Sequence, residues 1–215
     1  MYAPVHYVQH DKEALLALVR AKPFAHLLVN GADGPLAAHA PLIVELGENG
    51  ALELIGHVAR ANPFWREAEK AERALAVFNG PNAYVSPNLY PSKLENSRVV
   101  PTWNYIAIEA RGVIEVDAEP ANMRVFLERL TEQMEEGAKR PWRLADAPDD
   151  YVRNLSNGIV GLRMRVDALK GKWKLSQKAP ACDFAAVRDA FAASEFQNER
   201  DIAAAMAAIA HEEEA

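Results

Sequence analysis

The sequence predicts a mainly β fold in which an antiparallel barrel carries peripheral helices (α+β) and a helical C-terminal tail. Three observations point to it. Short β-rich runs recur between turn signals made of Gly, Asn and Asp, short amphipathic helices are inserted between these runs, and residues 183–215 become alanine-rich and acidic. Many short antiparallel strands with helices between them favour a small barrel over a parallel α/β sheet.

The first part of the chain alternates between helix and strand. Asp11 is suited to cap a short amphipathic helix, which Pro23 ends. A second short helix begins at Asn62-Pro63, a cap followed by a first-turn proline, and continues to about Arg73. The predicted strands are 24–30, 36–46, 51–58 and 74–79, with turns at Gly31-Ala32-Asp33-Gly34 and Gly47-Glu48-Asn49-Gly50.

The second part begins with a long polar and aromatic segment. Residues 80–101 contain four prolines, which predicts a functional loop rather than regular structure. A strand is predicted at 102–116, with Gly112 as a bulge or bend. The remaining predicted elements are helices at 120–136 and 149–155, a strand pair at 158–168 and 172–177 across Lys170-Gly171, and tail helices at 183–193 and 197–211.

The composition limits the class of protein. The chain has 215 residues, of which 50% are hydrophobic, enough for a sizeable core. Its formal charge of -6 argues against a broad affinity for nucleic-acid backbones. Cys182 is the only cysteine, so no intrachain disulfide is possible and a cytoplasmic location is expected. The N-terminus lacks a signal-peptide pattern and no apolar run is long enough for a bilayer, so no membrane association is expected.

The first candidate site is a strand-to-helix junction at residues 56–63, Gly-His-Val-Ala-Arg-Ala-Asn-Pro. An arginine there can hold an anion through two parallel hydrogen bonds, and the N–H groups of the following helix add partial positive charge. A phosphate group would suit this place. The alternative is that Arg60 is a solvated strand end and His57 is a packed barrel residue.

Two further stretches are rich in polar and aromatic side chains. Residues 78–93 and 100–105 combine proline with tyrosine, tryptophan, serine and asparagine, the mixture expected around a planar ligand with a polar rim. The alternative is an Ω-type loop closed by its own aromatic residues. Residues 171–178 alternate apolar and polar side chains, which is also the pattern of a half-buried edge strand with solvated lysines.

Taken in order, these stretches resemble the PaiB-type family of FMN-binding negative transcriptional regulators. That family is part of the flavin-binding split-barrel superfamily, with the pyridoxamine-phosphate oxidases and the flavin reductases. The resemblance covers about residues 1–180, and Leu89 and Lys178 depart from it, since an aromatic residue and an asparagine are expected there. The matching segments are MYAPVHYVQHD (1–11), GHVARANP (56–63), FNGPNAYVSPNLYPSK (78–93), VPTWNY (100–105) and GIVGLRMRVDALKGKWKLSQ (158–177).

The resemblance implies an antiparallel split β-barrel over residues 1–180 that binds flavin mononucleotide (FMN). Residues 181–215 would be a helical extension packed on the barrel. A homodimer would hold two FMN sites, each assembled from both subunits, with Arg60 on the phosphate. The residues implied to line the site are His57, Val58, Ala59, Arg60, Ser86, Thr102, Trp103, Asn104, Lys174, Ser176 and Gln177.

Three functions remain open at this point. The first is an FMN-binding regulatory protein, and the second is a flavin-dependent oxidoreductase, similar to flavin reductases or pyridoxamine-phosphate oxidases, that acts on a small substrate. The third, a DNA-binding module, would have to use the two tail helices. The second of these has Arg200 as its only arginine, so direct DNA binding is not expected. No histidine pair has the spacing of a metal site on a helix.

Overall fold

The computed structural model describes residues 1–47 and 50–209. Glu48 and Asn49 of the second predicted turn, the end of the last predicted helix, and the terminal glutamates lie outside the described residues. The strands follow one another as β1 (Val8–Gln9), β2 (Phe24–Gly31), β3 (Gly34–Pro41), β4 (Ile43–Leu46), β5 (Leu52–Ala59), β6 (Ala74–Val85), β7 (Thr102–Asp117) and β8 (Ile159–Lys174). They form one sheet in the order β3-β2-β6-β7-β8-β5-β4, and β1 pairs with β8.

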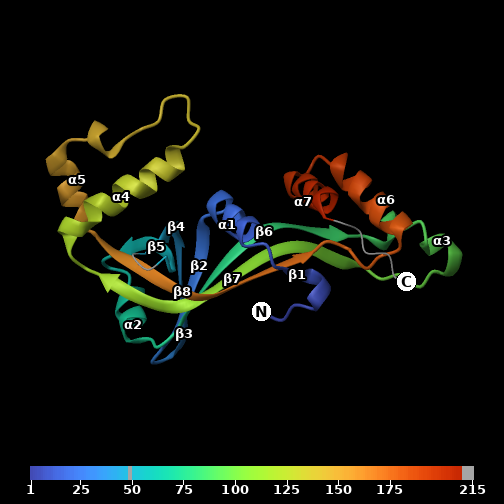
Figure 1. Cartoon of the computed structure of the whole chain (residues 1–215), viewed down its shortest axis with the longest axis horizontal. Helices are drawn as coiled ribbons and strands as arrows, with labels where there is room; N and C mark the ends of the chain where they lie inside the picture. The colour runs from blue at the N-terminus through green and yellow to red at the C-terminus, as the bar shows by residue number, and fades with distance from the viewer. Residues whose placement is uncertain (48–49, 210–215) are drawn as a thin grey trace. The chain divides into compact units, whose positions relative to one another are not determined.

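Helices lie between these strands and at the end of the chain (Figure 1). The α-helices are α1 (Lys12–Ala21), α2 (Phe64–Lys70), α3 (Lys93–Asn96), α4 (Pro120–Glu135), α5 (Asp149–Ser156), α6 (Ala181–Ala192) and α7 (Gln197–Ala208). The shorter 3-10 helices are η1 (Val5–Tyr7), η2 (Pro87–Leu89) and η3 (Leu144–Asp146). The antiparallel sheet with interspersed helices confirms the predicted fold class, a split β-barrel with peripheral helices and a helical C-terminal segment.

The chain divides into two compact units. Unit 1 consists of Met1–Leu15, Asn79–Ile108 and Lys170–Ala215, and unit 2 consists of Leu16–Phe78 and Glu109–Leu169. The strands β6, β7 and β8 each contribute residues to both units. The domain boundary expected at residue 180 stays a prediction.

The polar segment after residue 80 is partly a strand, so the prediction of a loop beginning at Gly80 is wrong. β6 continues to Val85, and the irregular part begins at Ser86. Its residues alternate between buried and exposed from Pro81 to Val85, as in a half-buried strand, and Gly80 and Pro81 are both buried. The pairing with β2 covers only Ala74–Val77, so Pro81 lies beyond that ladder. Pairing with β7 therefore outweighs the turn-forming composition of this segment.

β8 is a single strand, so the predicted strand pair across Lys170-Gly171 is wrong (Figure 1). A Cβ atom at Gly171 would lie 2.2 Å from Cδ2 of Leu15 and 2.5 Å from the ring of Trp173. The glycine thus allows close packing and does not make a turn. Gly112 also allows close packing within the sheet, because a Cβ atom there would lie 1.9 Å from the carbonyl oxygen of Arg165.

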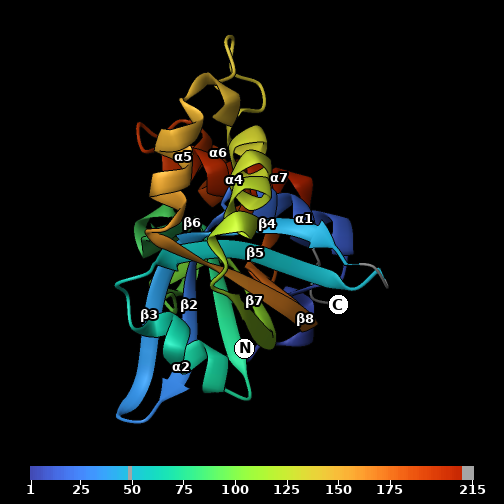
Figure 2. The same cartoon turned by 90° about the vertical axis from the view of Figure 1, so that its left-hand side faces the viewer.

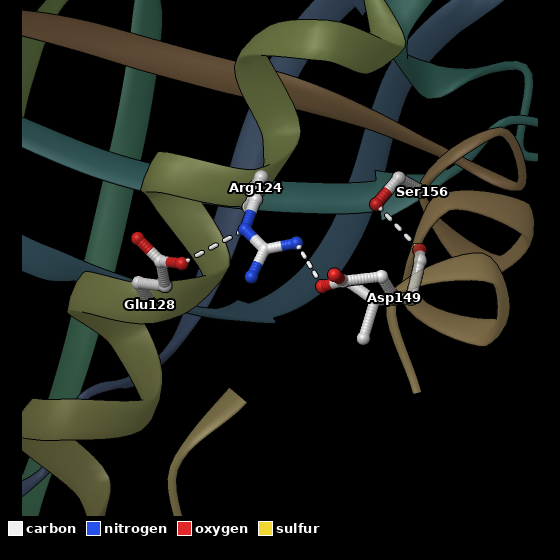
Figure 3. A network of polar contacts seen from close by, with 5 residues as sticks. Arg124, Glu128, Asp149 and Ser156 are labelled. Carbon is white, nitrogen blue, oxygen red and sulfur yellow. Dashed lines mark hydrogen bonds and ion pairs between the residues drawn. The ribbon is translucent and has the colours of Figure 1, made fainter. Parts of the chain in front are cut away.

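In unit 2, α4 and α5 lie side by side (Figures 1 and 2). Arg124 of α4 connects them: its Nε donates to Glu128 at 3.0 Å and its Nη1 donates to Asp149 at 2.8 Å (Figure 3). The hydrogen bond from Arg124 lowers the pKa of the Asp149 carboxyl group. The apolar side of α4 packs on the sheet in a buried cluster that comprises Ile43, Ile55, Phe126 and Leu130.

In unit 1, α6 and α7 pack against each other, and α6 also contacts η2. The carboxylate of Asp183, which is 3% exposed, accepts hydrogen bonds from the backbone N–H of Ser92 at 3.0 Å and from its hydroxyl at 2.6 Å. Charge-assisted hydrogen bonds of this kind hold the first turn of α6 to the loop before α3. Within the described residues, no helix is long and apolar enough to cross a membrane.

Candidate functional site

The strand-to-helix junction in unit 2 places Arg60 directly after β5. Its guanidinium donates to three backbone carbonyls: Nε to Asn157 at 2.8 Å, and Nη2 to Ala118 at 2.8 Å and to Ile159 at 3.0 Å. Among the described residues, only Nη1 of this guanidinium has no protein acceptor. Arg60 thus connects three chain segments, and the group still available for an anion is Nη1.

The turn after Arg60 is built by local hydrogen bonds. The side chain of Asn62 accepts a hydrogen bond from the backbone N–H of Phe64 at 3.0 Å, the capping contact expected from an Asn-Pro pair. The indole N–H of Trp65 donates to the carbonyl oxygen of Arg60 at 3.0 Å. The start of α2 is therefore held in one geometry relative to Arg60.

His57 packs under α4. Its ring meets the ring of Phe126 edge to face, with centroids 5.5 Å apart, and its Nδ1 is buried without a partner among the described residues. Burial lowers the pKa of the His57 imidazole below its ordinary value. The next two residues of the predicted flavin set differ in burial: Val58 is buried, whereas Ala59 is exposed.

The buried state of His57 predicts a pH dependence of stability. A lowered pKa in the folded protein means that the unfolded chain binds the proton more readily, so the free energy of unfolding decreases as the pH falls below 6.5. One such group changes the free energy by at most about 1.4 kcal/mol per pH unit. Urea unfolding between pH 5 and 8 measures it, and His57→Gln is expected to flatten the curve in the acid range. Equal slopes for both proteins would contradict this prediction.

In unit 1, a lysine binds the start of β7. The Nζ of Lys174 donates to Thr102 Oγ1 at 2.5 Å and to the carbonyl oxygen of Trp103 at 2.6 Å. Burial, with a smaller contribution from the positive charge of Lys172, lowers the pKa of the Lys174 amino group. A partly desolvated ammonium group favours the approach of an anionic ligand, which restores part of the lost solvation.

The chain reverses after Lys174 in a strained turn. Ser176 has a φ of 63°, in the left-handed region that residues other than glycine rarely adopt. Its hydroxyl donates to Asn104 Oδ1 at 2.9 Å, and Asn104, which is fully buried, also contacts the sulfur of Met206 at 3.7 Å. The side-chain amide of Gln177 donates to the carbonyl oxygen of Trp173 at 2.6 Å. These contacts support the strained backbone and fix the position of Lys174.

Two exposed aromatic rings lie beside this group. Trp103 is 53% exposed and Tyr84 is 48% exposed, and their ring centroids are 5.9 Å apart. Ser86, the remaining predicted site residue, accepts a hydrogen bond from the backbone N–H of Asn88 and caps η2. Unit 1 therefore brings Thr102, Trp103, Asn104, Lys174 and Ser176 together, whereas His57–Arg60 form a separate group in unit 2.

Lys172 was not among the site residues selected from the sequence, where the alternation of residues 171–178 was also compatible with solvated lysines on an edge strand. The residue is 9% exposed, and its Nζ lies 5.2 Å from the ring centroid of Tyr105 and 5.8 Å from that of Tyr2. It also donates to the carbonyl oxygen of Tyr2 at 3.2 Å. Alternation along one strand cannot show that the N-terminal segment covers it, because β1 pairs with β8 from a distant part of the sequence.

Comparison with known proteins gives the family of the chain. A family model described as "Putative FMN-binding domain" matches residues 1–168. The Bacillus subtilis protein named protease synthase and sporulation protein PAI 2 is 28% identical over 209 residues, which cover 96% of this chain and 96% of that protein.

Solved structures share the fold. The FAD and heme binding protein from Mycobacterium smegmatis superposes with a TM-score of 0.58 at 18% identity, over 84% of this chain and 79% of that one. The flavocytochrome Anf3 from Azotobacter vinelandii superposes with a TM-score of 0.59 at 14% identity, over 84% of this chain and 75% of that one. At such identities the likeness establishes a common fold.

Proposed function

The chain belongs to the FMN-binding family whose model matches residues 1–168, and from this premise we propose that it is a cytoplasmic, homodimeric flavoprotein of the PaiB type. FMN is its cofactor. When bound, FMN supplies the redox chemistry, and the protein supplies binding, orientation and electrostatics. Any regulatory effect on transcription is then exerted without tight contact between the isolated protein and DNA.

The observation that carries the proposal is the Lys174 group in unit 1. It combines a partly desolvated ammonium group, the strained turn at Ser176, and the exposed ring pair of Trp103 and Tyr84. A planar ligand that bears negative charge finds there a cation, hydrogen-bonding groups and flat apolar surfaces. Those features fit the isoalloxazine ring of FMN, which is planar and whose carbonyl oxygens and ring nitrogens accept hydrogen bonds.

In unit 2, we assign the phosphate of FMN to Arg60. Its Nη1 is the donor that remains after the three carbonyl contacts, and the carbonyls hold the guanidinium plane in place. A preorganised arginine loses little side-chain entropy when it binds an anion. This assignment predicts that FMN binds more tightly than riboflavin, which lacks the phosphate.

The test of the function is the absorption spectrum of the purified protein, followed by release of the yellow ligand and its identification by chromatography. FMN in a ratio near one per chain is the expected result. Protein that carries no flavin and takes up none from added FMN would contradict the proposal.

A homodimer is expected because unit 1 exposes large apolar side chains. Tyr84, Trp103 and Val100 are 48%, 53% and 74% exposed. Clusters of exposed aromatic and aliphatic residues are typical of protein interfaces. Light scattering at micromolar concentration should give twice the mass of 23.7 kDa. A monomer that still binds FMN would exclude a site shared between two subunits.

Tight binding to duplex DNA is not expected. Arg200 of α7 donates to the carbonyl oxygen of Ser194 and to Gln197 Oε1, both at 2.6 Å, and Glu199 and Asp201 lie beside it in the sequence. A recognition helix needs basic and amide side chains that face the DNA. Fluorescence anisotropy with purified protein and labelled duplex at about 150 mM salt measures this. Sequence-specific binding in the nanomolar range would overturn it.

A further inference from the structure

A pocket in unit 2 lies against α4 and the strands β5 and β8. Its volume is about 390 Å³, which is within the range of small-molecule sites. Four of its lining residues are apolar and at most 8% exposed. They are Ile55, Met123, Phe126 and Leu162. A ligand in this pocket would therefore bury an apolar body against α4 and the sheet.

Two arginines line the same pocket from different elements, Arg129 from α4 and Arg163 from β8. Each donates one hydrogen bond through Nη1, Arg129 to Glu45 at 2.7 Å and Arg163 to Glu53. The side chains of Glu45 and Glu53 are 19% and 14% exposed, whereas the side chains of Arg129 and Arg163 are 52% and 44% exposed. In the part of the chain that the structure describes, Nε and Nη2 of both guanidiniums have no protein acceptor.

The acidic group at the pocket is already hydrogen-bonded. Asp117 Oδ2 accepts from the side-chain amide of Asn122 at 2.9 Å, and its Oδ1 accepts from the backbone N–H of Glu119 at 3.0 Å. Glu45, which also lines the pocket, is paired with Arg129. Among the described residues, the guanidiniums of Arg129 and Arg163 thus keep hydrogen-bond donors without a protein acceptor, and charged donors of this kind favour an anion.

The wall formed by α4 is held in place independently of any ligand. Arg124, on the same helix, is hydrogen-bonded to Asp149 of α5 (Figure 3), and Phe126 is part of the buried cluster under the helix. A preformed pocket requires little ordering when a ligand binds, which favours affinity.

We propose that this pocket binds a small organic anion, with a carboxylate on the guanidiniums of Arg129 and Arg163 and an apolar ring against Ile55 and Phe126. The pocket lining does not include Arg60 or Lys174, the residues assigned to FMN above, and His57 of the predicted flavin set touches it only through the ring of Phe126. Two guanidiniums that converge on one pocket can hold a carboxylate through several charge-assisted hydrogen bonds. The ligand class is that of aromatic or branched aliphatic monocarboxylates.

Isothermal titration of 2-naphthoate into the FMN-saturated protein tests this site. The expected result is saturable binding of one molecule per chain. The neutral analogue 2-naphthalenemethanol should bind at least about tenfold more weakly, because it cannot accept charge-assisted hydrogen bonds as a carboxylate does. This comparison uses the unaltered protein, so it does not depend on the folding of a variant.

Variants locate the site. Arg163→Gln and Arg129→Gln should each weaken 2-naphthoate binding about tenfold or more. Arg165→Gln is the matched control. Arg165 lies on β8 like Arg163, but it pairs with Glu115 and does not line the pocket, so its replacement should leave the affinity for 2-naphthoate unchanged.

Three results would overturn the proposal. They are the absence of saturable 2-naphthoate binding below about 1 mM, equal affinity for the neutral analogue, and an equal loss in Arg165→Gln. A competition arm separates this site from the flavin site. If FMN displaced 2-naphthoate from flavin-free protein, the pocket would be part of the flavin site and the claim of a separate site would be wrong, whereas the proposed FMN binding would still hold.

Discussion

Replacing Arg60 with alanine is expected to lower the free energy of unfolding by about 2–4 kcal/mol and to weaken FMN binding about tenfold or more. The stability effect follows from the loss of hydrogen bonds to the carbonyls of Ala118, Asn157 and Ile159. A charged hydrogen bond contributes about 1.5–3 kcal/mol, and the sum is reduced here because Arg60 and its acceptors are partly exposed. Urea unfolding and FMN titration measure the two effects separately.

Riboflavin distinguishes a phosphate contact from a structural role of Arg60. If Arg60 holds the phosphate, Arg60→Ala weakens FMN binding and leaves riboflavin binding nearly unchanged, so the preference for FMN disappears. A variant that weakens both ligands equally would show that the arginine acts only on the fold. Arg66→Ala is the matched control, because Arg66 lies on α2, is exposed, and stacks on the ring of Trp65 at 4.4 Å.

Replacing Lys174 with methionine is expected to weaken FMN binding about tenfold, since it removes the cation near the exposed rings. The methionine keeps most of the apolar stem, so its packing is largely preserved. The loss should be accompanied by a small change in stability, because the ammonium also donates to Thr102 and to the carbonyl oxygen of Trp103. Flavin fluorescence titration gives the affinity, and urea unfolding gives the stability.

Lys170→Met serves as the charge-matched control for Lys174. Lys170 lies on the same strand and is exposed, so its removal alters the net charge equally without altering the group at Thr102. Equal losses of FMN affinity in both variants would point to long-range electrostatics and would contradict a specific role of Lys174. Repeating both titrations at higher salt strengthens the distinction, because only long-range effects are screened strongly.

Patterns within short segments were sufficient for most helices and strands. The cap at Asp11 is observed, since its side chain accepts a hydrogen bond from the N–H of Glu13 at 2.9 Å before α1. The runs 24–30 and 51–58 are strands as predicted. Such elements depend on caps, prolines and alternating apolar residues, and each of these acts over a few residues.

The errors arose where distant segments decide the structure. Composition alone indicated a loop at Gly80 and a turn at Gly171, but strand pairing and close packing keep both glycines inside strands. Sequence analysis also selected Arg60 and Lys174 as site residues, and their assignment to FMN stays a prediction. Their partners could not be foreseen, because the acceptors of Arg60 lie 58 to 99 positions away and Thr102 lies 72 positions from Lys174.

The amino-acid sequence alone therefore determined the fold class, most of the helices and strands, and the family of this protein, because these follow from local patterns and from motifs read along the chain; the run predicted as one strand at 36–46 is two strands, β3 and β4, which pair with different neighbours. The tertiary structure alone decided which carbonyls hold Arg60, that His57 lies under α4, and that two arginines line one pocket. The physical reason is that burial and hydrogen bonding depend on which segments meet, and this is settled only when the sheet has formed.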